Sequence, residues 1–257
     1  MTTDLQNAAL RALVCLDLTD LDDASDAAAV EELCRRAQTP EGSVAAVCVW
    51  PRFVPQAKAA LLHTGVRVAT VVNFPSGEED LDAVKSEARA AVANGADEID
   101  LVTPWRSVIA GGDAAIVAGL VREIREISGE ATLKAILETG ELKDPALIGL
   151  AAQAAIEGGA DFLKTSTGKT PVGATPEAAR MMLETIARLG GGTGFKASGG
   201  VRTLAQAAEY LALADEIMGP GWAGPRHFRI GSSSLLDAIL GTLAEDADGD
   251  AAGDDQA

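Results

Sequence analysis

Short apolar and β-branched runs recur along the whole chain and give the clearest signal of its secondary structure. Most of these runs are apolar at every position, which is typical of parallel strands covered by helices on a sheet. Segments with helical periodicity, such as Asp82–Ala93 and Pro176–Leu189, lie between them. The pattern predicts eight strands, at Leu13–Leu18, Val44–Trp50, Val66–Phe74, Glu98–Thr103, Thr132–Glu138, Asp161–Ser166, Gly194–Ser198 and His227–Gly231.

Helix boundary signals fall between the predicted strands. Asp144 and Thr175 each precede a proline, which predicts an N-cap followed by proline at the first helical position. Gly95 and Gly159 follow helical runs and open the near-identical phrases Gly-Ala-Asp, so they are predicted to end two equivalent helices. The strands start roughly 22 to 34 residues apart, which is the length of one βα unit.

Eight strands that alternate with about eight helices favour one closed α/β structure. We predict a single (β/α)₈ TIM barrel over residues 1–244, with an extra N-terminal helix at Asp4–Arg11 and a short acidic tail over residues 245–257. The tail is expected to be disordered because it holds few apolar groups. An open, Rossmann-like sheet is the alternative, but no G-x-G-x-x-G follows the first strand.

Composition narrows the choice of partners and of compartment. The 257 residues are 47% hydrophobic and carry a formal net charge of −17, which argues against nucleic acid and against an anionic membrane as partners. No basic, apolar leader and no long uncharged stretch is present, so we expect a cytoplasmic protein. Three cysteines and two histidines predict neither disulfides nor a metal site.

Three lysines are the strongest candidates for chemistry. The chain has seven lysines, and Lys134, Lys164 and Lys196 fall in three successive predicted strands. Because lysine is almost never buried without a partner or a task, they are expected to converge at one end of the barrel. The simpler alternative is that each ammonium is paired with a carboxylate, such as Asp100, in a buried ionic network.

Crowded cations would lower the pKa of one lysine and leave a free amine near neutral pH. A free amine attacks carbonyl groups, so the pattern favours Schiff-base chemistry, in which a protonated imine draws electrons from the neighbouring carbon–carbon bond. Asp100 is the carboxylate best placed to move protons in such a reaction.

Two glycine- and serine-rich loops follow the last two predicted strands. Ser198–Arg202 and Gly231–Leu235 stand where barrels commonly bind phosphate through backbone N–H groups and a helix N-terminus, and Lys169 could add an ammonium. The alternative is that the glycines only form a tight turn and the serines only cap a helix. Together the two loops favour a phosphate site.

Several segments resemble deoxyribose-phosphate aldolases, in order and with matching spacing from about Leu10 to about Leu243. These segments are Asp17–Thr19, Cys48–Arg52, Asn73–Pro75, Gly95–Asp100, Leu133–Leu142, Phe162–Gly168 and Lys196–Arg202. The resemblance implies a metal- and cofactor-independent class I aldolase that reversibly cleaves 2-deoxy-D-ribose 5-phosphate to D-glyceraldehyde 3-phosphate and acetaldehyde. The expected partners of such an enzyme are a small sugar phosphate and aldehydes. The resemblance leaves the oligomeric state open between monomers, homodimers and larger assemblies.

The resemblance also implies roles for individual residues. Lys164 would form the imine, Lys196 would perturb its pKa and donate protons, and Asp100 would act with a water as proton shuttle. Substrate contacts are implied for Asp17, Thr19, Cys48, Lys134 and Thr167. The alternative for Cys48 is a small buried core residue with no part in turnover. Phosphate contacts are implied for Gly168, Lys169, Gly199, Gly200, Val201, Arg202, Gly231, Ser232 and Ser233.

Two other functions fit parts of the pattern. Another Schiff-base barrel, such as a transaldolase-like or keto-acid aldolase, would keep the lysines but act on a different phosphorylated sugar or acid. An isomerase or sensor that binds a sugar phosphate would keep the glycine and serine loops and would need no lysine in the sixth strand. Lys164 separates this isomerase or sensor from the Schiff-base aldolases, and a panel of phosphorylated sugars separates the aldolases from one another.

Overall fold

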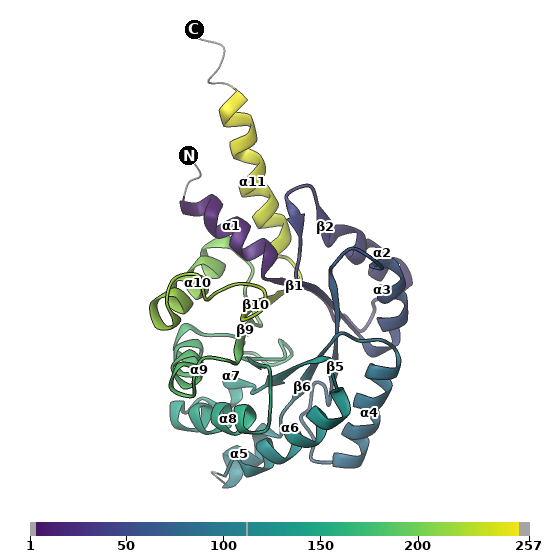
Figure 1. Cartoon of the computed structure of the whole chain (residues 1–257), viewed down its shortest axis with the longest axis vertical. Helices are drawn as coiled ribbons and strands as arrows, with labels where there is room; N and C mark the ends of the chain where they lie inside the picture. The colour runs from purple at the N-terminus through teal and green to yellow at the C-terminus, as the bar shows by residue number, and fades with distance from the viewer. Residues whose placement is uncertain (1–3, 112, 252–257) are drawn as a thin grey trace.

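The computed structural model describes residues 4–111 and 113–251, and residues 245–251 by their backbone alone. In this part of the chain, eight parallel strands close into a barrel in the order β1-β10-β9-β8-β7-β6-β5-β4. Helices surround the strands in Figure 1. The predicted TIM barrel is therefore confirmed.

Each predicted strand segment overlaps one barrel strand. The strands are β1 (Leu16–Asp20), β4 (Ala46–Val49), β5 (Arg67–Val72), β6 (Glu98–Val102), β7 (Thr132–Ile136), β8 (Phe162–Lys164), β9 (Gly194–Ser198) and β10 (Phe228–Ser232). The largest difference is at the first strand, because Leu13 and Val14 end the N-terminal helix α1 (Asp4–Val14). A short antiparallel hairpin of β2 (Gln38–Thr39) and β3 (Gly42–Ser43) was not predicted.

The helices follow the predicted order. After α1 come α2 (Ala27–Arg36), the 3₁₀ turn η1 (Pro51–Phe53), α3 (Val54–Ala60), α4 (Leu81–Ala93), α5 (Trp105–Gly111), α6 (Ala115–Ser128), α7 (Thr139–Leu142), α8 (Pro145–Glu157), α9 (Pro176–Arg188), α10 (Leu204–Met218) and α11 (Leu235–Ala251). The Asp144 and Thr175 side chains accept hydrogen bonds from the first turns of α8 and α9, so both predicted N-caps are confirmed. None of the described helices is both long and apolar enough to cross a membrane.

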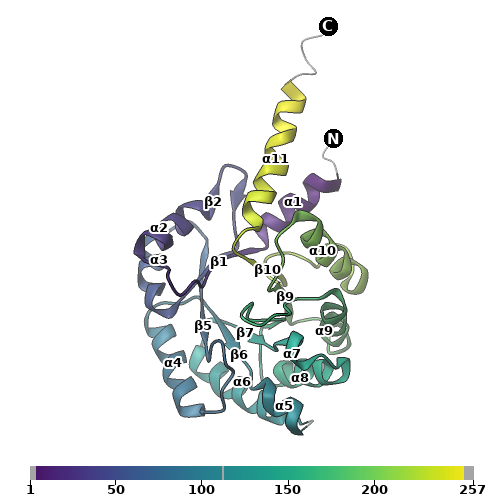
Figure 2. The ribbon, with the colours of Figure 1, turned by 180° about the vertical axis from the view of Figure 1, so that it is seen from behind.

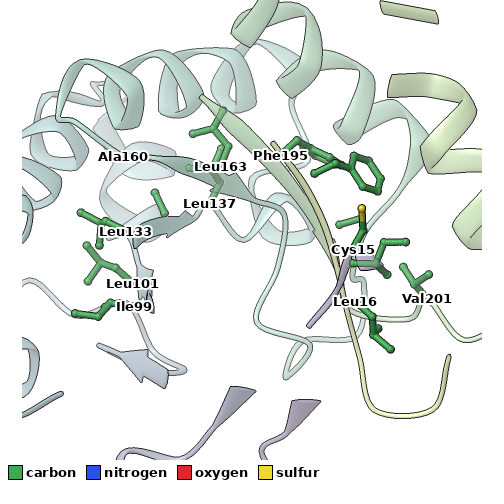
Figure 3. Close-up of a cluster of buried hydrophobic side chains, with 14 of the residues drawn as sticks. Cys15, Leu16, Ile99, Leu101, Leu133, Leu137, Ala160, Leu163, Phe195 and Val201 are labelled. Atoms are coloured by element: carbon green, nitrogen blue, oxygen red, sulfur yellow. The ribbon is translucent and has the colours of Figure 1, made fainter. Parts of the chain in front are cut away.

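The strands that carry charged residues place many of their apolar residues on the outer face of the barrel. Figure 3 shows Ile99, Leu101, Leu133, Leu163 and Phe195 within the buried apolar cluster. All five are completely buried. Because side chains alternate along a strand, the positions between them point into the barrel. In β6 to β10 each strand carries at least one charged residue at an inward position. This alternation was not recognised in the sequence.

The acidic C-terminal segment begins inside a helix. α11 passes the expected boundary at residue 245 and reaches Ala251, and its C-terminal end extends beyond the barrel in Figure 2. The helical backbone of residues 245–251 differs from the disorder that composition predicts. Extending an existing helix through alanine-containing sequence costs little. The rest of the predicted tail, residues 252–257, lies outside the described residues.

Candidate active site

Seven charged side chains from six adjacent strands meet inside the described barrel, and we call them the charged cluster. They are Asp17 (β1), Glu98 and Asp100 (β6), Lys134 (β7), Lys164 (β8), Lys196 (β9) and Arg229 (β10). All seven are buried. Buried charges are stable only when they are paired, and every member of this cluster forms ion pairs with other members.

Asp100 lies at the centre of the three lysines. Its Oδ2 atom is 2.7 Å from Lys164 Nζ and 2.8 Å from Lys196 Nζ. Its Oδ1 atom is 2.7 Å from Lys134 Nζ. The three lysines converge as predicted, around the carboxylate of Asp100. The same three ion pairs also form the buried ionic network that was the alternative prediction. The two interpretations are compatible, because the lysines differ in how many carboxylates they touch.

Lys164 has the fewest carboxylate partners of the three lysines. Lys196 Nζ contacts Asp100 and also Asp17, at 2.5 Å from Oδ2. Lys134 Nζ contacts Asp100 and Glu98, with Asp17 at 3.5 Å. Lys164 Nζ contacts Asp100 alone among the described carboxylates. The ammonium form is therefore supported least at Lys164.

The pKa shifts follow from this difference in partners. Burial lowers the pKa of Lys164; the attraction of Asp100 opposes this and the Lys196 ammonium reinforces it, so the net pKa is below the usual range. Burial also acts to lower the pKa of Lys134 and Lys196, but their carboxylate partners more than compensate and raise both. Burial would raise the pKa of Asp100, yet the three ammonium groups hold it well below its usual range.

Two glycines on the inward face make room for large neighbours. A Cβ atom at Gly231 would lie 3.0 Å from Lys196 Cε, and one at Gly194 would lie 2.5 Å from the Phe162 ring. Larger residues at these positions would displace the lysine or the ring. Gly231 was predicted to contact phosphate, and here it also leaves space for the Lys196 side chain.

A cavity of about 710 Å³ opens at the carboxyl ends of the strands. It is bounded by α2 and by the loops that follow β1, β8, β9 and β10. Lys164 is the member of the charged cluster that lines the cavity, among the residues described. The other predicted residues Asp17, Lys134, Lys196 and Asp100 lie beneath it, out of its lining. The lysine with the lowered pKa is thus also the one that a small molecule can reach.

All nine residues predicted to contact phosphate line this cavity. They are Gly168, Lys169, Gly199, Gly200, Val201, Arg202, Gly231, Ser232 and Ser233. The φ angles of Gly199 and Gly200 are +84° and +89°, in the region that favours glycine. Within the described residues, no acceptor bonds the backbone N–H groups of Gly200 and Val201. Unbonded N–H donors in a turn that lines the cavity suit an anion.

Two of these side chains, Ser232 and Lys169, form hydrogen bonds within the protein. The Ser232 hydroxyl donates to the Val201 carbonyl at 2.6 Å and accepts from the N–H of Leu235 at the start of α11. It therefore joins the two loops and caps the helix, as the structural alternative expected. The Lys169 ammonium donates to the Leu21 carbonyl at 2.7 Å. Lys169 thus links the loop after β8 to the loop after β1.

Thr167 is held by the buried Glu138, for which no role was predicted from the sequence. The Thr167 hydroxyl donates to Glu138 Oε2 at 2.5 Å, and its N–H also donates to this carboxylate. Glu138 adopts a left-handed backbone conformation with φ of +55°, which directs the chain from β7 into α7. Thr167 lines the cavity and Glu138 fixes its orientation. Thr19 also lines the cavity, and its hydroxyl donates to the Asp17 carbonyl.

Cys48 does not line the cavity. It is completely buried in β4 and packs in a small apolar cluster with Leu21, Ala69 and Val71. Burial raises the pKa of its thiol, so the nucleophilic thiolate is disfavoured. This environment favours the interpretation of Cys48 as a small core residue.

We expect Cys48→Ala to retain kcat/KM within a few-fold of the unchanged protein, with a stability loss of about 1 kcal/mol from the lost sulfur contacts. Steady-state kinetics and thermal unfolding measure both effects. A folded Cys48→Ala protein that is nearly inactive would instead place the thiol in the chemistry.

Glu98 and Arg229 were not predicted as site residues from the sequence. Both lie within correctly predicted strands, and each stands two residues before another inward residue, Asp100 or Gly231. Counting every second position inward from those residues would have found them. The acidic rim of the cavity formed by Asp22, Asp23 and Glu32 was also missed.

Comparisons with known proteins agree with this geometry. The model of the DeoC/LacD family of aldolases matches residues 11–240. A candidate deoxyribose-phosphate aldolase from Toxoplasma gondii ME49 shares 29% identity with a TM-score of 0.85, over 94% of this chain and 97% of that one. Another from Coccidioides immitis shares 30% identity with a TM-score of 0.80, over 91% and 87%.

A third neighbour extends the comparison. The tetrameric deoxyribose phosphate aldolase of Aeropyrum pernix shares 25% identity with a TM-score of 0.72, over 94% of this chain and 97% of that one. The family match covers most of the barrel, including every strand that contributes to the charged cluster. This chain therefore belongs to the DeoC/LacD family of aldolases.

Proposed function

We propose that this aldolase cleaves 2-deoxy-D-ribose 5-phosphate reversibly to D-glyceraldehyde 3-phosphate and acetaldehyde through a Schiff base on Lys164. The observation that carries the proposal is the position of Lys164, whose amine lines the cavity and has one carboxylate partner. The neighbours named deoxyribose-phosphate aldolases support the choice of substrate.

In the proposed reaction, the neutral Lys164 amine attacks the C1 aldehyde of the open-chain sugar, and loss of water gives a protonated imine. The imine accepts the electron pair of the C2–C3 bond as the C3 hydroxyl loses its proton. D-Glyceraldehyde 3-phosphate leaves, and an enamine remains on Lys164. Protonation of the enamine at C2 and hydrolysis then release acetaldehyde and restore the amine.

Asp100 and Lys196 would move protons in these steps. Asp100 contacts Lys164 directly but does not line the cavity, so a water would carry protons between this carboxylate and the substrate. Lys196 remains an ammonium because Asp17 and Asp100 hold it, and it can return a proton to Asp100. Asp17 and Lys134 support these groups from below.

The loops at Gly199–Arg202 and Gly231–Ser233 would hold the 5-phosphate at the cavity wall. The donors there are the unbonded N–H groups of the turn and the N-terminal end of α11, which both favour an anion. Binding the phosphate at a fixed point would place the aldehyde end over Lys164. The remote phosphate therefore contributes to orientation of the reacting carbon.

We expect removal of the phosphate from the substrate to lower kcat/KM by about 10² or more, since that binding energy orients the sugar. Gly200→Val should lower kcat/KM toward the phosphorylated sugar and change activity on 2-deoxyribose much less. Coupled detection of D-glyceraldehyde 3-phosphate and of acetaldehyde measures both substrates. A panel of other phosphorylated sugars and keto acids tests the alternative aldolase reactions.

Gly221→Val is the matched control for the phosphate loop. Gly221 has a φ of +85° and open space around it, as Gly200 does, but it does not line the cavity. Both variants carry the same backbone strain, so a loss specific to Gly200→Val reports on the phosphate site. Equal kcat/KM for the phosphorylated and unphosphorylated sugars would remove phosphate binding from the proposal. Turnover of another member of the panel in place of 2-deoxy-D-ribose 5-phosphate would make that compound the substrate.

The compartment is part of the proposal. Cys15, Cys34 and Cys48 are all buried free thiols, which is typical of proteins in a reducing compartment such as the cytoplasm. A sugar phosphate and small aldehydes would be the partners there.

A further inference from the structure

A second set of ion pairs in the charged cluster joins Arg229 to Asp17 and Glu98. The Arg229 guanidinium is 2.7 Å from Asp17 Oδ1 through Nη1 and 2.8 Å from Glu98 Oε1 through Nη2. Its Nε–H donates to the Pro225 carbonyl at 2.6 Å. Arg229 is therefore held on three sides, and its guanidinium fixes two carboxylates of the charged cluster.

Every carboxylate oxygen in the charged cluster has a cationic partner. Asp17 uses Oδ1 for Arg229 and Oδ2 for Lys196. Glu98 uses Oε1 for Arg229, and its Oε2 atom is 2.6 Å from Lys134 Nζ. Both oxygens of Asp100 are occupied by lysines. No carboxylate oxygen in the described cluster is left for a further cation.

The charges of the cluster balance without Lys164. Three carboxylates face three groups that have at least two carboxylate partners each, namely Lys134, Lys196 and Arg229. A charged Lys164 would give the seven-residue cluster one excess positive charge, which low-dielectric surroundings oppose. A neutral Lys164 leaves none.

We propose that Arg229 and Glu98 are positioning residues that set this balance in opposite directions: the Arg229 guanidinium keeps Lys164 the amine that stays uncharged and able to attack a carbonyl, and the Glu98 carboxylate limits that effect. This inference deepens the proposed Schiff-base function and rests on it for its catalytic meaning. Arg229 acts through Asp17, which it orients toward Lys196. Glu98 acts through Lys134, which it draws away from exclusive pairing with Asp100.

The groups that face Lys164 come from several strands and one loop. Asp100 contacts Lys164, and Lys196 contacts the same Asp100 carboxylate. Cys48 of β4 and Glu138 after β7 lie close enough to Lys164 to interact with it electrostatically. Arg229 is faced by the charged groups Asp17, Glu98 and Lys134, by the Cys15 thiol and by the Phe162 ring, whose centroid is 5.6 Å from its Cζ atom. The pH dependence of Lys164 therefore depends on this whole set. Arg229 and Glu98 neither line the cavity nor pair with Lys164, so changing them leaves its direct partner Asp100 in place.

The test uses two substitutions of opposite charge. Arg229→Met removes a buried positive charge, so the Lys164 ammonium becomes more favourable and its pKa should rise. Glu98→Gln removes a buried negative charge, so the Lys164 pKa should fall. We expect each midpoint to move by about one pH unit, in opposite directions. Arg229→Lys keeps the charge and should leave the midpoint near its original value.

The readout is the titration of the Lys164 ε-carbon by ¹³C NMR in the full chain, with the signal assigned by its loss in Lys164→Met. The pH profile of kcat/KM with deoxyribose 5-phosphate is the second readout. The double variant Arg229→Met/Glu98→Gln removes one charge of each sign and should restore the midpoint. Circular dichroism and thermal unfolding verify that each variant is folded.

A structural role alone would lower stability in both variants without opposite shifts of the Lys164 titration. Shifts in the same direction, or no shift in a folded variant, would overturn the inference even if the unchanged protein forms an imine. If either single variant does not fold, the double variant and Arg229→Lys still decide the question. A Lys164 titration midpoint that moves in Arg229→Lys, which keeps the charge, contradicts charge balance. Opposite shifts in a protein that forms no imine would instead support charge balance and refute the Schiff-base function.

Discussion

Replacing Lys164 by leucine should abolish formation of a reducible imine and lower kcat/KM by at least about 10⁴-fold. Leucine retains much of the apolar stem of lysine but has no nucleophile. Asp100 would still contact Lys134 and Lys196, so the barrel should remain folded. Because the nucleophile itself is lost, no recovery is expected at alkaline pH.

Borohydride trapping with acetaldehyde gives the direct measurement. In the unchanged protein, reduction of the imine should leave an N-ethyl group on Lys164, located by peptide mapping within Asp161–Lys169. Lys196 should carry no adduct because it is held as an ammonium by Asp17 and Asp100. An adduct on Lys196 or Lys134, or a Lys164→Leu protein that forms the imine at the normal rate, would overturn the assignment.

Lys196→Leu should lower kcat/KM by about 10² to 10⁴-fold at neutral pH, the range that general acid–base groups contribute. Loss of this ammonium removes a positive charge next to Lys164 and leaves Asp100 with fewer partners. Both changes favour the charged form of Lys164 and raise its pKa. Fewer molecules then carry a free amine at neutral pH, and the fraction rises again as the pH increases.

The expected result is therefore a profile of kcat/KM displaced toward alkaline pH, with partial recovery there. Lys85→Leu is a suitable control because it removes a surface ammonium paired with Glu123, far from the charged cluster in the fold. Its pH profile should be unchanged. A Lys196→Leu profile with an unchanged midpoint would limit Lys196 to proton transfer.

Much of the fold could be predicted because its signals are local. Apolar runs, prolines after capping residues and glycines at helix ends depend on neighbours a few residues away, so all eight barrel strands and the caps at Asp144 and Thr175 were found. Errors occurred where two local signals overlap. At Leu13 and Val14 an apolar run predicts a strand, but packing extends α1 through these residues.

The candidate site was predicted in part for the same reason. Lysines in apolar strands and glycines after strands stand out in one dimension, and a barrel brings strand ends together whatever the details of packing. The sequence could therefore name Lys164, Asp100 and the loops around the cavity. Glu98 and Arg229 escaped notice because acids and arginines are common in sequence, and their burial becomes apparent only in the folded chain.

By itself the sequence determined the barrel, the order of its strands along the chain and the set of lysines available for chemistry, since these follow from periodicity and residue type. Only the tertiary structure decided which lysine is left with a single carboxylate partner. Lys164 and Asp100 are 64 residues apart, and Arg229 and Asp17 are 212 apart. Their pairing depends on the register of the closed sheet and on burial, because a charge in a low-dielectric interior is governed by its spatial neighbours and not by its neighbours in sequence.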